Sequence, residues 1–392
     1  MRRFLYAMMM LLAGASLSNA QTNDHLYRSW RWEEDLSAPR PAGLAGAFVA
    51  VANDSSATTL NPAGLVTLPE GEIAGSLLWR RSGTVGPGDS LAAASGLGFL
   101  GGARRFGSWG FGAFYSEPRD VQIGLNPIAL PDRTRDQGFL DATVKDFGGS
   151  VAYRVSPRLR LGGGLMGTRL ELSGAGDREF KRGLDVEHVN ASAEDTALRA
   201  TVGALYDWSD KLRLGLTART GGTWKVARSA WVISQALVLD PGSLYEVRAP
   251  DVYSAGASYR LRDRLLVSGQ LDYVRYSRIS SGLTQAVGNP GGVYALDNAF
   301  EPRVGAEWWH PLRSLELQLR GGLYSEAGNA IRYIGGDTAE MATFPGADRR
   351  LLGSAGASIV KIRGSGRGLA FDTGMVFGGD RTVFVAGARL SR

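Results

Sequence analysis

Long runs in which polar and apolar residues alternate are the feature that most constrains this chain. From about residue 73 onward the alternation has a period of two, as in residues 315–320 (LELQLR), and clusters of Gly, Pro, Asp and Asn interrupt it. This period is typical of β-strands with two different faces. The runs are about 10 to 14 residues long, longer than the roughly 5–6 residues of an ordinary strand. Tilted strands that cross a bilayer have this length.

The number and spacing of these runs predict an all-β fold, a 14-stranded antiparallel transmembrane β-barrel over residues 73–392. Short turns follow every second strand and long connections follow the others, which is the arrangement of outer-membrane barrels. The strands are predicted near residues 73–81, 89–104, 109–117, 143–155, 158–172, 196–208, 211–222, 251–261, 264–278, 301–310, 313–325, 350–362, 368–378 and 381–390, and the long connections at 118–142, 173–195, 223–250, 279–300 and 326–349. Aromatic residues near strand ends predict two interfacial girdles: Trp79, Trp109, Tyr153, Tyr206, Trp208, Tyr259, Tyr273, Tyr276, Trp308 and Phe377.

Two segments precede the barrel. Residues 1–20 have the pattern of a cleaved secretory signal peptide, with Arg2 and Arg3 before an apolar stretch and small residues at 18–20. Residues 21–72 lack strand alternation and contain an Ala/Gly-rich run at 42–52. Small residues pack closely in a confined space, so we expect 21–72 to form a plug, or hatch, inside the barrel.

Residues 46–57 (GAFVAVANDSSA), followed by Asn61-Pro62-Ala63-Gly64-Leu65, resemble the hatch of the FadL-like outer-membrane transporters of long-chain fatty acids and aromatic hydrocarbons. The hairpin 253–276 and the stretches 302–308 and 319–324 are also similar to this family. The resemblance implies fourteen strands, a hatch in which Asn61, Pro62, Ala63 and Gly64 form a gate, and a lateral opening at a kink in the third strand. Gly110, Gly112 and Pro118 are the candidates for that kink.

The resemblance implies passive uptake of hydrophobic small molecules, by capture at the outer loops, rearrangement of the hatch and lateral exit. A related branch with similar hatch residues, the PorV-like barrels, serves as a shuttle or scaffold for a protein secretion system, and this remains the alternative. The expected surroundings are the outer membrane of a Gram-negative bacterium, with its lipid and the barrel-assembly machinery as partners of a monomer.

Composition argues against several other classes of protein. The chain has no Cys, and its 44 Lys and Arg exceed 38 Asp and Glu without forming a dense basic cluster, so we expect no disulfides, thiolate metal site or nucleic-acid partner. His25, His188 and His310 are the only histidines. His188 lies near Asp185 and Glu187, which we interpret as a solvated loop. We therefore expect no catalytic residue, metal or cofactor.

An uncharged apolar run at residues 230–239 lies inside the fourth outer loop, the long connection at 223–250, and is the strongest candidate for solute capture. On a helix, four of its residues share one face. The alternatives are a loop that packs on itself and a strand that extends above the membrane. The predicted ligand-binding residues of this run are Trp231, Val232, Ile233, Ala236 and Leu237.

Strand parity also directs six charged residues into the barrel: Arg199, Arg219, Asp272, Glu307, Arg320 and Asp372. Charges in such a place need partners or water, so an ion-pair network is the simpler interpretation. The alternative is that one arginine binds the carboxylate of a solute, since a guanidinium matches that shape. Arg199, Arg219 and Arg320 are the candidates for this role.

Overall fold

The computed structural model describes residues 25–32, 36–81, 90–91, 93–130, 133–180, 186–232, 237–280, 293–362 and 368–392. The predicted signal peptide at 1–20 lies outside these residues, as do Ile233, Ala236 and the side chain of Leu237.

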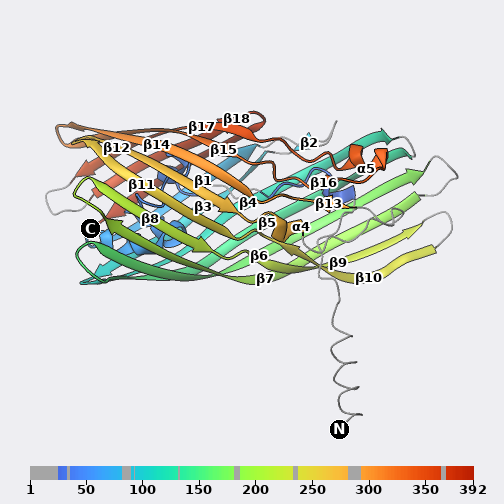
Figure 1. Ribbon diagram of the computed structural model, residues 1–392, viewed down its shortest axis with the longest axis horizontal. Coiled ribbons are helices and arrows are strands. Elements are labelled where there is room, and N and C mark those ends of the chain that lie inside the picture. The colour runs from blue at the N-terminus through green and yellow to red at the C-terminus, as the bar shows by residue number, and fades with distance from the viewer. Residues whose placement is uncertain are drawn as a thin grey trace, which may run out of the picture.

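Fourteen antiparallel strands, which we call staves, close into a barrel in the described part of the chain (Figure 1), which confirms the predicted fold class. Each stave pairs with the next, and the last pairs with the first, for example at Trp79 and Phe384. The staves are β1 (Gly71–Arg81), β3 (Ala94–Phe106), β4 (Trp109–Leu130), β5 (Arg133–Arg154), β6 (Leu159–Phe180), β7 (Val186–Asp207), β8 (Leu212–Arg219), β11 (Val252–Arg262), β12 (Leu265–Val274), β14 (Ala299–Leu312), β15 (Leu315–Glu326), β17 (Arg350–Ile362), β18 (Gly368–Gly378) and β19 (Arg381–Ser391).

The connections are sorted by length, as predicted. Short turns at one end of the barrel (Figure 1, left) join β3 to β4, β5 to β6, β7 to β8, β11 to β12 and β14 to β15. The longer connections from β12 to β14 and from β15 to β17 begin and end at the opposite end, where the two-residue turn at 379–380 is an exception.

Four staves are much longer than predicted. β4, β5, β6 and β7 each have 22 residues and extend beyond the other staves at the end with the long connections (Figure 1, right). The predicted connections at 118–142 and 173–195 are therefore wrong, because most of these residues continue the strands. Polar residues there hid the alternation of the apolar face, but strands outside a bilayer need no apolar outer face.

The predicted connection at 223–250 is a β-hairpin of β9 (Thr223–Val232) and β10 (Leu237–Arg248). β7 pairs with β8 through residues 201–207 and with β9 through 187–192, so β9 continues the stave that β8 begins. Val232 lies opposite Leu237 in this hairpin. The helical face considered for residues 230–239 is therefore wrong, and the extended strand is the observed arrangement.

The remaining elements are short: η1 (His25–Tyr27), α2 (Pro39–Gly43), α3 (Ala57–Leu60), η2 (Pro62–Thr67), β2 (Ser90–Leu91), α4 (Ser277–Ser280), β13 (Tyr294–Ala295), β16 (Arg332–Tyr333) and α5 (Thr338–Thr343). None of the helices in the described residues has the length and hydropathy needed to span a membrane.

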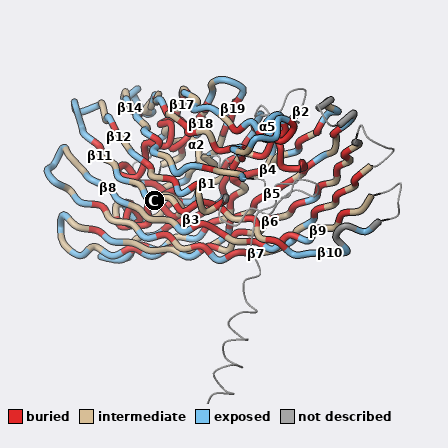
Figure 2. The backbone as a smooth tube through the Cα atoms, turned by 45° about the vertical axis from the view of Figure 1, so that its right-hand side comes forward, coloured by how far each residue is buried: buried red, intermediate tan, exposed pale blue. Residues whose placement is uncertain are grey.

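Buried and exposed residues alternate along the staves (Figure 2). The outward face exposes large apolar side chains, among them Leu165, Leu198 and Phe371. Aromatic rings gather near both ends of the staves, with Trp109 against Tyr153 at the end with the short turns and Tyr273 against Phe300 at the other. Eight of the ten predicted girdle residues are exposed and Tyr273 is half-buried, but Tyr276 is buried and its hydroxyl donates to Glu301, so its assignment was wrong.

Candidate functional site

Residues 36–68, which we call the N-terminal segment, lie inside the barrel and belong to the predicted hatch. Helix α2 packs against β17 and β18, while η2 packs against β5, β6 and β7. Most of the segment is fully buried, including Phe48, Ala52 and Leu65. The small side chains at 42–52 allow this backbone to run close to the inner wall.

The predicted gate residues Asn61, Pro62, Ala63 and Gly64 are all buried. The Asn61 side chain accepts a hydrogen bond from the backbone N–H of Ala63 (3.2 Å) and donates one to the carbonyl of Val49 (2.7 Å). A Cβ on Gly162 of β6 would lie only 2.4 Å from the Ala63 nitrogen. The wall therefore needs glycine at this place, where the segment touches it directly.

Arg40 anchors the N-terminal segment to β14. Its guanidinium donates two hydrogen bonds to the carboxylate of Glu307, at 2.9 and 2.7 Å, and lies 3.1 Å from Asp54. Burial lowers the pKa of Arg40, but these two carboxylates outweigh burial and raise it above its ordinary value. Burial raises the pKa of Asp54, but Arg40 and Arg389 outweigh burial and lower it overall.

The six charged residues predicted to point inward are all buried or half-buried, and most of them are ion-paired. Arg320 contacts Glu307 (2.6 Å), and Asp372 contacts Arg389 (3.3 Å). Arg199 donates to the carbonyl of Thr220 (3.1 Å). These contacts favour a structural network, and of the three candidate arginines only Arg219 lines the interior cavity described next.

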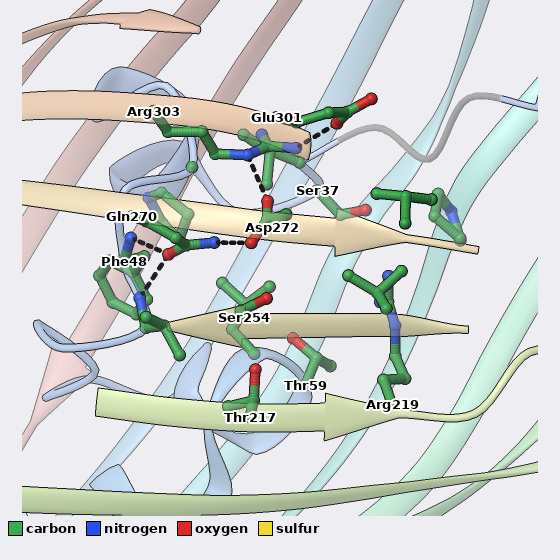
Figure 3. Close-up of a pocket in the computed structure, with 18 of the residues that line it drawn as sticks. Ser37, Phe48, Thr59, Thr217, Arg219, Ser254, Gln270, Asp272, Glu301 and Arg303 are labelled. Carbon is green, nitrogen blue, oxygen red and sulfur yellow. Dashed lines mark hydrogen bonds and ion pairs between the residues drawn. The ribbon is translucent and has the colours of Figure 1, made fainter. Parts of the chain in front are cut away.

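An interior cavity of about 180 Å³ lies between the N-terminal segment and the wall (Figure 3). Residues 36–38, 46 and 48–49 of the segment bound one side, and inward side chains of β7, β8, β11, β12 and β14 bound the other. Gln270 accepts hydrogen bonds from the backbone N–H groups of Phe48 (3.0 Å) and Val49 (2.9 Å), and so fixes the segment against β12. The gate residues 61–64 do not line this cavity.

The ladder between β3 and β4 is incomplete beside this cavity. The two strands pair from Phe106 and Trp109 as far as Phe99 and Ser116. Beyond that point Ala94 to Leu97 of β3 pair with β1 and, among the described residues, with no part of β4. Phe99, Ser116 and Pro118 also line the cavity, so the cavity reaches the wall where the ladder ends. We call this place the β3–β4 gap.

Of the three residues predicted to kink this strand, Pro118 is the one that lies at the gap. The pairing of β4 with β5 also shifts register around it, between Ser116 and Arg119. Gly110 and Gly112 were predicted to kink this strand, but both are regularly paired on either side. They instead accommodate the N-terminal segment, because a Cβ on Gly110 would lie 2.7 Å from Leu65 and one on Gly112 would lie 2.5 Å from Thr58.

Two groups close the gap. The guanidinium of Arg80, from β1, donates hydrogen bonds to the backbone carbonyls of Glu117 (2.8 Å) and Asp120 (3.4 Å) of β4. The backbone of Ser37 lies at the inner side, where its carbonyl accepts a hydrogen bond from the Ser76 hydroxyl (2.7 Å). Sequence reasoning missed both residues, because neither belongs to a motif or to an interrupted strand pattern.

The half of the barrel nearest the long connections, which we call the outer half, is filled by apolar side chains of β4 to β7, β9 and β10. They pack around Leu26, Tyr27, Trp30 and Trp32. Trp32 stacks on Trp224 of β9 at a ring distance of 5.6 Å. Trp231 and Val232, predicted to capture solute, are half-buried at the outer end of β9. The Trp231 ring lies 4.6 Å from His188.

His188 contacts the Asp177 carboxylate (2.5 Å) and the side chain of Asn190 (3.1 Å). Glu187 is buried, and Asp185 lies outside the described residues. Within the described part of the chain, His, Asp and Glu side chains form no group of three or more that could hold a metal ion.

Solved structures with the same architecture include a FadL homologue of Pseudomonas aeruginosa, with a TM-score of 0.67, 14% identity and coverage of 93% of this chain and 98% of that chain. The toluene transporter TodX of Pseudomonas putida gives a TM-score of 0.62 with 12% identity, over 92% of this chain and 97% of that chain. The toluene transporter TbuX of Ralstonia pickettii gives 0.58 with 14% identity, over 90% and 96%. No model of a protein family matches the sequence, and neither does any curated protein. The chain therefore has the fold of the FadL-like barrels.

Proposed function

We propose that this protein is a channel in the outer membrane of a Gram-negative bacterium, through which small hydrophobic molecules enter passively. The observation that carries the proposal is the interior cavity that reaches the β3–β4 gap. The exposed apolar belt between two bands of aromatic rings supports a membrane location. The toluene transporters that share the fold support a hydrophobic solute.

In the proposed route, solute is captured at the outer ends of β9 and β10, near Trp231 and Val232, and reaches the cavity below. Removal of apolar surface from water is favourable by about 25 cal/mol of free energy for each Å², so capture needs no energy source. From the cavity the solute leaves sideways through the β3–β4 gap into the bilayer. Passage requires Arg80 and the backbone around Ser37 to move, and we infer that a shift of the N-terminal segment, with the gate at Asn61 to Gly64, permits this.

The size of the cavity favours compact solutes. Its volume of about 180 Å³ is close to that of an engineered cavity of about 150 Å³ that binds benzene. Pockets for drug-sized ligands have about 300–1,000 Å³. A single aromatic ring therefore fits the closed cavity, whereas a long-chain fatty acid requires a larger displacement of the N-terminal segment.

A reversible cross-link across the gap tests the route. A Cβ on Gly96 would lie 2.6 Å from a carboxylate oxygen of Glu117, so the side chains at these two positions meet across the gap. The chain has no Cys of its own, so Gly96→Cys with Glu117→Cys introduces one defined pair. The measurement is the initial rate of radiolabelled toluene uptake into intact cells of a Gram-negative host without another channel of this fold.

Oxidation of this pair is expected to lower uptake at least tenfold, and reduction to restore it. The matched control is Gly102→Cys with Ala113→Cys, at positions that face each other where the ladder is complete, and uptake there should not depend on oxidation. Equal uptake by the oxidised and reduced gap variant, with the disulfide verified by mass spectrometry, would exclude lateral exit. Absence of any uptake by the parent, with a secretion partner bound in stoichiometric amount, would favour the shuttle alternative.

A further inference from the structure

The side chain of Glu117 lies in the β3–β4 gap itself. A Cβ on Gly96 of β3 would lie 2.6 Å from one carboxylate oxygen of Glu117, so this carboxylate reaches across the gap to the edge of β3. Its other oxygen accepts a hydrogen bond from the hydroxyl of Tyr115 (2.7 Å). Because β3 and β4 do not pair at this place, a solute that leaves sideways passes the carboxylate at close range.

The carboxylate of Glu117 forms no ion pair with any of the described residues. The guanidinium of Arg80 donates to the backbone carbonyl of Glu117 and not to its carboxylate, and the Tyr115 hydroxyl that does contact the carboxylate is neutral. Residues 82–93, which connect β1 to β3 beside the gap, include no Lys or Arg. The hydrogen bond from Tyr115 therefore fixes the position of a negative charge in the gap without neutralising it.

The depth of this carboxylate relative to the apolar belt decides which solutes it affects. Gly96, which Glu117 contacts, pairs with Leu78 of β1, and the neighbours Leu77 and Trp79 are exposed on the outward face. Trp79 belongs to the aromatic band near the end with the long connections, and such rings mark the boundary between hydrocarbon and headgroups. An amphiphile keeps its charged group at this boundary, because a charge is costly to bury in hydrocarbon. A fatty acid anion that leaves through the gap therefore carries its carboxylate directly past Glu117.

Electrostatic repulsion makes this passage unfavourable for an anion. Glu117 is half-buried, and the repulsion between two like charges is stronger and less screened by salt in such a place than in water. A neutral solute meets only a polar side chain at the same point. The obstacle thus depends on the charge of the solute.

We propose that Glu117 is a specificity-determining residue of the lateral exit, which passes neutral hydrophobic solutes and excludes anionic ones. The inference rests on the channel function proposed above and adds the charge class of the solute. It distinguishes hydrocarbons and alcohols, which are neutral, from fatty acids, which are ionised at pH 7. The protein is then a channel for the neutral class.

The first test compares radiolabelled octanol with octanoate, which differ at one end of the same chain. The measurement is the initial rate of uptake at pH 7 into cells of a host without another channel of this fold, after subtraction of the rate in the empty host. In the parent, octanol should enter at least tenfold faster than octanoate. Glu117→Gln keeps an acceptor for Tyr115 but removes the charge, so octanoate uptake should rise at least tenfold while octanol uptake changes less than twofold. The matched control is Asp141→Asn, which removes a carboxylate from β5, at a position paired with Gln122 and away from the gap, and should change neither rate.

The second test measures the charge in the gap without any transport. Gly96→Cys introduces the only thiol of the chain beside the carboxylate. In the purified full chain, this thiol should react with a positively charged methanethiosulfonate in preference to a negatively charged one, by at least tenfold beyond the ratio found for a free small thiol. The added change Glu117→Gln should abolish this excess, whereas Asp141→Asn should leave it intact.

The two tests separate failure of the inference from failure of the channel function. If octanol is taken up through the parent but Glu117→Gln does not raise octanoate uptake, or Asp141→Asn raises it equally, only the selectivity is wrong. A thiol ratio that does not depend on Glu117 also overturns the selectivity. If the thiol ratio depends on Glu117 but octanol is not taken up through the parent, the charge in the gap is established, and the channel function is wrong together with the selectivity that rests on it.

Discussion

Replacing Arg80 by Met should open the β3–β4 gap. Arg80 is 7% exposed, and its guanidinium bridges β1 to the stretch of β4 that does not pair with β3. Hydrogen bonds from a charged donor contribute about 1.5–3 kcal/mol each. The hydrogen bond from Arg80 to the backbone carbonyl of Glu117 is 2.8 Å long and contributes the full free energy, whereas the 3.4 Å hydrogen bond to the carbonyl of Asp120 contributes little. The closed gap therefore loses about 2 kcal/mol.

A loss of about 2 kcal/mol corresponds to a roughly 25-fold rise in the open population, since 1.4 kcal/mol is a factor of ten. If opening limits passage, the initial rate of toluene uptake in Arg80→Met cells rises by a similar factor. Arg81→Met is the control, because Arg81 is the next residue of β1 and is exposed on the opposite face. Uptake within twofold of the parent, at equal amounts of folded barrel on gels, would refute the view that Arg80 holds the exit closed.

Three further predictions concern the N-terminal segment. Glu307→Gln removes the main acceptor of Arg40 and should destabilise the docking of the N-terminal segment by about 3 kcal/mol. The measurement is hydrogen exchange of the backbone amides at residues 38–56, which should become faster. The control Glu316→Gln should leave exchange at these residues unchanged. Because the folded-state pKa of Asp54 is lowered, its contribution is present above the ordinary value of 3.8 and is lost as the pH falls through the folded value. The protection of the backbone amides at 38–56, relative to their intrinsic exchange rate at the same pH, should therefore fall below about pH 4 in the parent. It should respond less to acid in Asp54→Asn. Gly162→Ala places a Cβ 2.4 Å from the Ala63 nitrogen and should lower the free energy of unfolding by about 1–3 kcal/mol, seen in thermal unfolding. The control Gly163→Ala, whose Cβ has its nearest contact 3.7 Å away, should be neutral.

The barrel could be predicted from the sequence because its physical signal is local and repeated. Alternation such as that of residues 315–320 reports two different environments on the two faces of one strand. The pattern failed where that difference disappears. Residues 186–195 continue β7 but carry polar residues on the outward side, so they were interpreted as a loop. The apolar run at 230–239 suits a helix or a strand, and pairing with β7 and β10 decided between them.

The candidate site was predicted much less well, because it is assembled from side chains far apart in the chain. Parity placed Asp272, Glu307 and Arg320 inside, but it does not identify Arg40 as the partner of Glu307. The cavity combines Trp32, Phe48, Thr201 and Gln270 from four separate regions, and although Phe48 and Gln270 lie in stretches that resemble the family, nothing in the sequence brings the four together. The gap depends on which neighbour β3 pairs with, a property of the register that no single strand encodes.

The 22-residue strands β4 to β7 place the mouth of the barrel well away from the bilayer. At about 3.3 Å per residue such a strand is about 73 Å long, and a tilt of about 40° leaves an axial height of about 55 Å. The apolar band of an outer-membrane barrel is only about 25 Å tall. In the proposed outer-membrane location, about 30 Å of paired, stiff sheet would therefore stand outside the hydrocarbon layer on one flank of the molecule.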